Sequence, residues 1–169
     1  MSGLHKLRGH PLLAGFAAPD WVEDVEPPEV VQLQAQLPLQ PDVQLIEPID
    51  DGEHYEARIA SSGRISTRPG SWHDAFNALI WSRWPQLKRA LNRRQAADFA
   101  ANGKHQRSRA QMAITHFDES GLVVVISDPA LLDAWSRHDW VALFETHRDA
   151  WGKQIVVWPV GHALLALLR

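Results

Sequence analysis

The stretch SWHDAFNALIWSRW, residues 71–84, has the pattern of a helix packed into a core. Its large apolar residues recur at helical spacing, at Trp72, Phe76, Leu79, Ile80 and Trp84. Ser71 is a favourable N-cap residue, and Pro85 both ends this helix and suits the start of another. The sequence therefore predicts one helix over 72–84, a second from Pro85 to Asn102-Gly103, and a third over 106–116.

On the N-terminal side of this stretch, residues 54–68 have the pattern of a β-hairpin. Alternation places Tyr55, Ala57 and Ile59 on one face of a strand. Ser61-Ser62-Gly63 is a turn sequence, and residues 64–68 are predicted to return as the second strand before Pro69-Gly70 ends it.

On the C-terminal side, two β-branched runs predict strands buried on both faces: LVVVI at 122–126 and IVVW at 155–158. Between them, residues 131–147 have a helical pattern that is interrupted near His138-Asp139. Strand, helix and strand in this order predict a right-handed parallel βαβ unit. A last helix is predicted over 163–168.

The first fifty residues differ in composition from the rest. They hold seven of the eleven prolines, which excludes a long helix, and they carry too many apolar residues to stay in water. We expect a Pro-rich acidic wrapping arm at 1–50, with a short helix near 28–36, and a single domain at 51–169. The expected fold is α+β: a small mixed sheet, made of the hairpin and the parallel βαβ unit, covered by helices.

Composition narrows the chemistry. The chain has 169 residues, of which 45% are hydrophobic and 22% charged, as expected for one globular domain. It has no cysteine, so thiol nucleophiles and zinc-thiolate sites are excluded. No apolar run reaches the roughly 18 residues of a membrane span, so a soluble cytoplasmic protein is expected. Phosphate-binding GxxxxGK[ST], GxGxxG, GxSxG and HExxH motifs are also absent.

Charge is segregated along the chain. Residues 1–50 carry eight acidic against two basic residues, whereas residues 64–109 carry ten basic against two acidic residues. Either the basic stretch binds an anionic partner such as nucleic acid, or the acidic arm folds back over it. We favour the intramolecular interpretation.

The densest polar cluster in an apolar setting runs from Arg68 to Asn77. On a helix, His73 and Asn77 share one face and could jointly hold a metal, a phosphate or a reacting water. The helix N-terminus would favour a neutral His73. Asp74 also fits a capping box with Ser71, which is a purely structural role.

Two further clusters follow. Asp118 and Glu119 are adjacent carboxylates that could bind a cation or exchange protons, although Asp-Glu-Ser-Gly is also ordinary turn chemistry. Asp128 and His162 follow the two predicted parallel strands, whose carboxyl ends commonly bind ligands. Asp128 also has the simpler role of an N-cap before Pro129.

The order of motifs resembles the bacterial family known as domain of unknown function 3025. The resemblance covers roughly residues 50–165, and its most specific part is Trp-His-Asp-Ala-Phe-Asn-Ala-Leu at 72–79, with Phe-Asp-Glu-Ser-Gly at 117–121 and Gly-His-Ala-Leu at 161–164. It implies that these blocks hold shared site or folding residues, but it brings no established activity. Members of this family continue past the last block, so the resemblance implies that a chain ending at Arg169 is shortened or lacks a terminal element.

These observations lead to two main functional hypotheses, and a purely structural or interaction protein is the third possibility. The first is a metal-assisted hydrolase acting on an anionic substrate. Its candidate catalytic residues are His73, Asp74, Asn77 and His162, its candidate substrate-binding residues are Arg68 and Arg107, and its candidate ligands of a divalent metal, zinc or manganese, are His73, Asp118, Glu119 and His162. The alternative is a non-catalytic module that binds nucleic acid or an acidic protein through the basic helices at 83–109. Sequence alone leaves open whether the protein is an enzyme.

Overall fold

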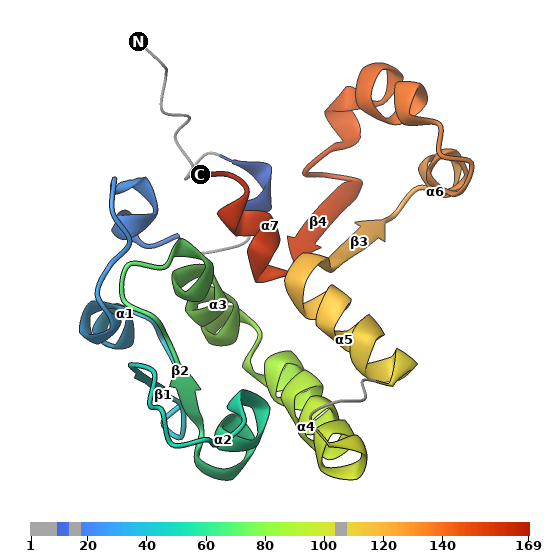
Figure 1. The fold of residues 1–169 in the computed structure, drawn as a ribbon. Coiled ribbons are helices and arrows are strands. Elements are labelled where there is room, and N and C mark those ends of the chain that lie inside the picture. Colours follow the sequence, from blue (N-terminus) through green and yellow to red (C-terminus); the bar gives the residue numbers. More distant parts are fainter. Residues whose placement is uncertain (1–9, 14–17, 104–107) are drawn as a thin grey trace.

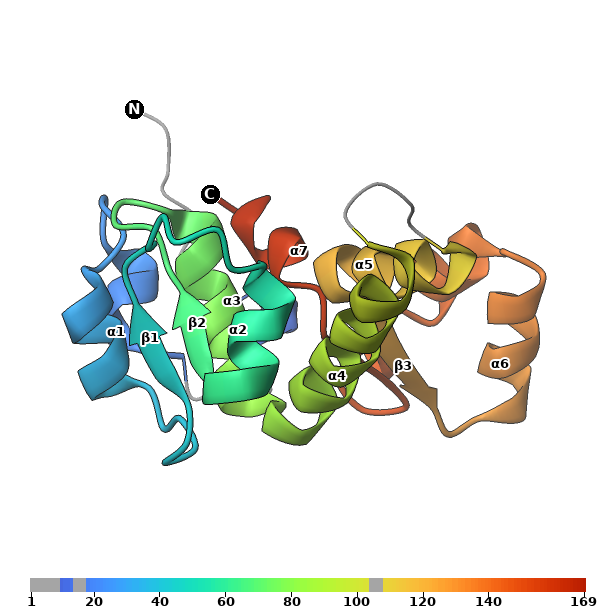
Figure 2. The same ribbon diagram turned by 60° about the horizontal axis from the view of Figure 1, so that its bottom comes forward.

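The computed structural model describes residues 10–13, 18–103 and 108–169. It has an α+β fold in which two small, separate two-stranded sheets lie toward opposite ends of the molecule (Figure 1). Figure 2 shows helices α4 and α5 between the two ends, with α3 and α7 between these helices and the first sheet. The single mixed sheet expected from the sequence is wrong, because the strands of the described residues form two separate sheets of two strands each.

The first sheet pairs β1 (Gln44–Ile46) with β2 (Arg64–Ser66) in parallel. The predicted hairpin at 54–68 is wrong, because α2 (Tyr55–Ser62) occupies the place of its first strand. His54 caps this helix by accepting a hydrogen bond from the Glu56 amide, and Gly63 ends it with a φ of 70°. A glycine in the left-handed conformation suits both a hairpin turn and a helix C-cap. In this structure Gly63 is the C-cap.

The second sheet pairs β3 (Leu122–Ile126) with β4 (Ile155–Pro159) in antiparallel orientation. The predicted parallel βαβ unit is therefore wrong, although both strands were placed correctly. The connection is not one long helix: α6 (Pro129–Ser136) ends near His138, whose φ is 57°. Two short helical turns, at Ala142–Thr146 and Arg148–Ala150, follow α6 and lead the chain into β4.

The same sheet is not buried on both faces. Val123, Val125 and Trp158 are exposed, whereas Ile155 is fully buried. Continuous β-branched runs are typical of strands in the centre of a sheet. The same runs also occur in strands of a two-stranded sheet with one covered face, and sequence alone does not distinguish the two cases.

Four helices connect the two ends. The predicted helices at 72–84 and from Pro85 are confirmed as α3 (Trp72–Arg83) and α4 (Pro85–Asn102). The third, α5, runs from Arg109 to Ser120 and so lies further along the chain than predicted. The last, α7, begins at His162 and ends at Ala166. None of the helices in the described ranges is both long enough and apolar enough to span a membrane.

The main core joins the N-terminal half to α3 and α7. Trp21, in a short helical turn at Asp20–Glu23, packs against Trp72 and Phe76 with ring centroids 6.1 and 6.0 Å away. The predicted short helix near 28–36 is confirmed as α1 (Val30–Gln36). A separate wrapping arm is not confirmed, because β1 belongs to residues 1–50 yet forms half of the first sheet.

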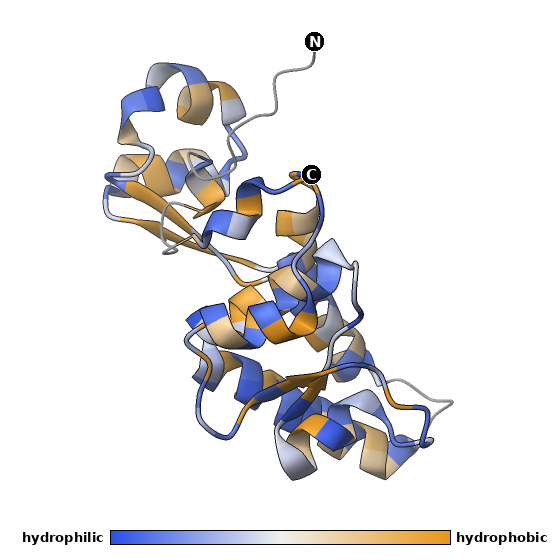
Figure 3. Ribbon diagram, turned by 90° about the vertical axis from the view of Figure 1, so that its left-hand side faces the viewer, coloured by the Kyte–Doolittle hydropathy of each residue, from blue (hydrophilic) through white to orange (hydrophobic). Residues whose placement is uncertain are grey.

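A second, smaller core of Leu131, Ala134, Leu143, Ala150 and Ile155 lies beneath the antiparallel sheet. Figure 3 shows hydrophobic residues along the strands, whereas the helices alternate between hydrophobic and hydrophilic residues around their circumference. Such alternation is expected of helices that cover a core on one side and meet water on the other.

Candidate functional site

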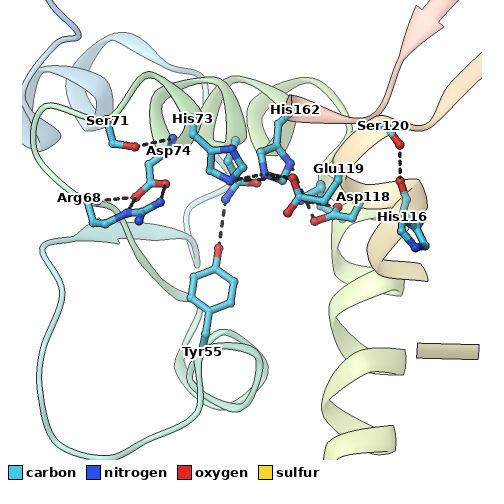
Figure 4. A network of polar contacts seen from close by, with 12 residues as sticks. Tyr55, Arg68, Ser71, His73, Asp74, His116, Asp118, Glu119, Ser120 and His162 are labelled. Atoms are coloured by element: carbon cyan, nitrogen blue, oxygen red, sulfur yellow. Dashed lines mark hydrogen bonds and ion pairs between the residues drawn. The ribbon is translucent and has the colours of Figure 1, made fainter. Parts of the chain in front are cut away.

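Three helices from distant parts of the chain bring His73, Glu119 and His162 together (Figure 4). Nε2 of His162 lies 3.0 Å from Nε2 of His73 and 3.6 Å from Oε2 of Glu119. Nε2 of His73 lies 4.0 Å from the same carboxylate oxygen. The two histidines stand at the N-terminal ends of α3 and α7, and Glu119 stands in the last turn of α5.

A close backbone contact places His162 against Glu119. The amides of Val160 and Gly161 both donate to the carbonyl of Gly121, at 3.0 and 2.9 Å, which fastens the start of α7 to the end of α5. A Cβ on Gly161 would lie 2.4 to 2.5 Å from main-chain atoms of Ser120 and Glu119. Only glycine allows the two backbones to approach this closely.

His162 is held in its neutral form. It is 4% exposed, and its burial, reinforced by the nearby charge of Lys88, lowers the pKa of the imidazole from 6.5 to about 4. At neutral pH the ring therefore offers a lone pair, which is the form that binds metal ions. His73 and Glu119 are both partly exposed, so the cluster has one buried and two accessible members.

Asp118 lies behind this cluster rather than in it. One carboxylate oxygen accepts a 2.5 Å hydrogen bond from Lys88, and the other lies 4.0 Å from Nδ1 of His162. Residues 117–120 are helical, whereas turn chemistry was the simpler prediction for them. Because successive helical residues point about 100° apart, Asp118 and Glu119 face opposite edges of the His162 ring, and the geometry favours Glu119 as the ligand.

Asp74 pairs with Arg68. Ser71 accepts a hydrogen bond from the Asp74 amide, as predicted for an N-cap, but the Asp74 carboxylate does not complete the capping box. It accepts hydrogen bonds from the Arg68 amide and, at 2.9 and 2.8 Å, from the Arg68 guanidinium. Although burial raises the pKa of Asp74, these bonds outweigh it and hold the pKa below its ordinary value.

Asn77 contacts Tyr55, which sequence reasoning did not assign to the site. Its amide nitrogen lies 3.1 Å from the Tyr55 hydroxyl, and in Figure 4 that hydroxyl points toward the histidine cluster. Burial of the hydroxyl, followed by the charge of Glu56, raises the pKa of Tyr55. Tyr55 was not predicted as a site residue because its segment was interpreted as a strand. It lies instead in the first turn of α2, which directs its side chain toward α3.

Most of the side chains described above line one cavity of about 400 Å³: Tyr55, Arg68, His73, Asp74, Asn77, Asp118, Glu119 and His162. Glu56 also lines it, and Asn92 donates a 2.6 Å hydrogen bond to the Glu56 carboxylate. Burial raises the pKa of Glu56, more than the Asn92 bond lowers it. Tyr55-Glu56 also belongs to the motifs that resemble the family, but Glu56 was not predicted as a site residue, because a single glutamate in a predicted strand indicates no particular chemistry.

Two candidates from the sequence lie elsewhere. Asp128 caps α6 by accepting a 2.8 Å hydrogen bond from Ala130. Its predicted position beside His162, at the carboxyl ends of parallel strands, is wrong because β3 and β4 are antiparallel. Arg107 lies outside the residues that the structure describes.

The family described as "Protein of unknown function (DUF3025)" matches residues 43–169. The chain belongs to the DUF3025 family. The match confirms the resemblance seen in the sequence and extends it to include β1. Every residue that lines the cavity, from Pro48 to His162, falls within the matched range. The chain has no match among curated proteins or among solved structures.

Proposed function

We propose that this DUF3025 protein is a metal-assisted hydrolase whose divalent cation is bound by Nε2 of His73, Nε2 of His162 and the carboxylate of Glu119. One observation carries the proposal: three potential ligand atoms from three separate helices lie within 4.8 Å of one another at the wall of a cavity. Three protein ligands leave coordination positions open for water and substrate, which is typical of catalytic rather than structural metal sites.

The spacing of the ligand atoms suits a transition metal. An ion about 2.1 Å from two imidazole nitrogens separates them by about 3.0 Å when the angle at the ion is a right angle, and by about 3.4 Å when it is tetrahedral. The Nε2 atoms of His73 and His162 are 3.0 Å apart. The Glu119 oxygen is 3.6 and 4.0 Å from them, and its partly exposed side chain can close that gap by rotating. Two nitrogens and one oxygen suit zinc or manganese.

The surrounding residues have separate roles in this proposal. The cation polarises the substrate or activates a water molecule, which is the chemistry that such ions supply in hydrolases. Neutral His162 keeps its nitrogen available at physiological pH. Asn77 and Tyr55 form one side of the cavity and orient the substrate there.

An anionic substrate would be bound mainly through the cation. Arg68 lines the cavity and its side chain is 64% exposed, but its guanidinium is already paired with Asp74. Arg68 is the one Lys or Arg side chain among the described residues that line the cavity, so without a cation the cavity offers an anion no unpaired basic side chain. Binding of the anion is therefore expected to depend on binding of the metal.

The alternative, a module that binds nucleic acid through the basic helices, has less support. Lys88 is buried against Asp118, and Arg89 pairs with Asp42 of the acidic N-terminal segment. The second pair supports the intramolecular explanation of the charge segregation. Trp81 is buried in the core, so it offers no surface on which a base could stack.

Metal titration tests the proposal directly. The protein is stripped with a chelator and then titrated calorimetrically with Zn²⁺ and Mn²⁺, and one ion per chain is expected. His73→Ala should abolish this binding, whereas His147→Ala, which removes an exposed histidine outside the cavity, should not. Loaded protein should hydrolyse p-nitrophenyl acetate or bis(p-nitrophenyl) phosphate. Absence of one-to-one binding, or binding that survives His73→Ala, would contradict the proposed site.

Elemental analysis of the protein as purified identifies the native ion. Two histidines and one carboxylate also bind iron in oxygenases. Iron in the purified protein, together with oxygen consumption and no hydrolysis of either probe, would exclude the hydrolase.

A further inference from the structure

Behind the candidate metal site lies a buried ion pair whose position calls for an explanation. Lys88 of α4 is only 4% exposed, and its ammonium lies 2.5 Å from Oδ1 of Asp118 on α5. The same ammonium lies 5.5 Å from the centre of the Trp81 ring. A buried lysine is rare unless it is paired, and a hydrophobic pair would often hold two helices together equally well.

The free oxygen of Asp118 faces the side of His162 that is turned away from the cluster. Oδ2 of Asp118 lies 4.0 Å from Nδ1 of His162, whereas Nε2 of the same ring faces His73 and Glu119. Nδ1 is buried and has no hydrogen bond of good geometry, although the main-chain carbonyl of Asp118 interacts with the ring and favours its protonated form. When Nε2 holds a cation, Nδ1 must carry the proton of the ring, and that N–H needs an acceptor.

Asp118 is suitably placed to be that acceptor. A shift of about 1 Å would bring the two atoms within hydrogen-bond distance. Metal-binding histidines usually donate their second N–H to a carboxylate or a carbonyl, which fixes the ring and makes its other nitrogen a better ligand. Lys88 holds the opposite oxygen of Asp118, so the carboxylate is kept behind the ring and away from the ion.

We infer that Lys88 and Asp118 are positioning residues of the metal site: Lys88 fixes the Asp118 carboxylate, and Asp118 orients the His162 ring toward the ion. This inference rests on the proposed function. It assigns to Asp118 a role behind a ligand in place of the ligand role expected from the sequence. It also assigns a role to Lys88, which was not among the predicted site residues.

The test compares metal affinity in two pairs of variants. Lys88→Met with Asp118→Asn replaces the buried pair without leaving an unpaired charge inside the protein. Arg89→Met with Asp42→Asn is the matched control, because it removes an ion pair of the neighbouring α4 residue at the surface. Zn²⁺ affinity is measured by competition with a chelating dye, at a temperature well below unfolding of each variant. The visible spectrum of bound Co²⁺ reports the geometry of the site.

The inference predicts a weakening of Zn²⁺ binding by about 10- to 100-fold in the first double variant and an altered Co²⁺ spectrum. The control should match the wild type in both measurements. Asp118→Asn alone should also weaken binding, because an amide is a poorer partner for the ring N–H than a carboxylate. Lys88→Arg, which keeps the charge, should retain most of the affinity. If the double variant does not fold, the last two variants decide the question.

The failures are distinguishable. Wild-type protein that binds no Zn²⁺ overturns the proposed function together with this inference. Wild-type binding with unchanged affinity and spectrum in the folded variants of Lys88 and Asp118 overturns the inference alone. That result would mean that the pair only joins α4 to α5, or that the main-chain carbonyl of Asp118 is sufficient for His162. A lower melting temperature with unchanged Zn²⁺ affinity would overturn the inference in the same way.

Discussion

Nε2 of His73 and Nε2 of His162 lie 3.0 Å apart, although 89 positions separate the two residues in the sequence. At this distance two imidazoles either share one proton or face one cation. The ring of His162 is neutral at physiological pH because it is buried beside Lys88. At pH 7 the two rings can therefore either share a proton or bind a cation. Only in the second case should metal ions raise the free energy of unfolding of the protein.

Added metal should stabilise the fold. A ligand that binds only the folded state at a hundred times its dissociation constant raises the free energy of unfolding by about 2.7 kcal/mol. Zn²⁺ should therefore raise the melting temperature of the wild type, measured by calorimetry, and should leave that of His73→Ala unchanged. His73 is partly exposed, so this substitution should by itself cost little stability. An equal rise in both proteins would mean that Zn²⁺ binds elsewhere.

Acid should destabilise the metal-free protein through His162. The pKa of this group is about 4 in the folded chain against 6.5 ordinarily, so between these values the unfolded chain binds more protons. Stability should therefore rise with pH across this window, by roughly 3 kcal/mol for the full shift. Urea unfolding in the presence of a chelator, at several pH values from 4 to 7, measures it. In His162→Gln this part of the dependence should vanish.

Asp74 contributes to acid unfolding in a different range. Its pKa lies below 3.8, so its contribution is lost only as pH falls through that lower value. A pH dependence above 4.5 that persists unchanged in His162→Gln would therefore point to some third group.

Gly161→Ala should disrupt the site without touching any of its side chains. The new methyl group would overlap main-chain atoms of Glu119 and Ser120, so α7 or the end of α5 must shift. We expect a loss of about 1 to 3 kcal/mol in stability and a large loss of Zn²⁺ affinity. Gly152→Ala is the control, because its φ of 77° makes it costly as well, but its Cβ would meet open space. Normal Zn²⁺ binding by Gly161→Ala would refute the role assigned to this contact.

Asp74→Asn should affect stability rather than metal binding. Asp74 is largely buried and joins the chain before α3 to its first turn through three hydrogen bonds from Arg68. Loss of the charge should cost about 1 to 2 kcal/mol, since Arg68 itself is well solvated. Asp133→Asn, which breaks an exposed pair with Arg137, should cost under about 0.5 kcal/mol. If Asp74→Asn instead lowers the affinity for Zn²⁺, Asp74 has a functional role in the site as well as a structural one.

Nucleic-acid binding should be weak and should not depend on the site. Arg93 and Arg94 of α4 are exposed, and they are the natural contacts for a polyanion. Fluorescence anisotropy with a labelled single-stranded DNA is expected to show only weak binding that disappears as salt increases. Tight binding that is lost in Arg93→Glu with Arg94→Glu, and kept in His73→Ala, would favour the binding module over the enzyme.

Helices α3 and α4 were predictable because their signals are local. Ser71, Pro85 and Gly103 mark helix ends by their own backbone and capping preferences, and α3 and α4 begin and end at these positions. The strand pairings were not predictable. Gly63 suits a hairpin turn and a helix C-cap equally, and LVVVI suits a parallel or an antiparallel partner. Which alternative holds depends on contacts with distant residues.

For the candidate site, the sequence by itself determined the chemistry available: no thiol, and histidines and carboxylates in short blocks of the DUF3025 family. It also placed His73 and His162 at helix starts, since capping and glycine preferences act within a few residues. Only the tertiary structure decided that Glu119 joins them while Asp118 turns back to Lys88, and that Tyr55 and Glu56 enter the same cavity. These choices follow from how α2, α4, α5 and α7 pack, and packing distributes its energy over contacts that no single stretch of sequence contains.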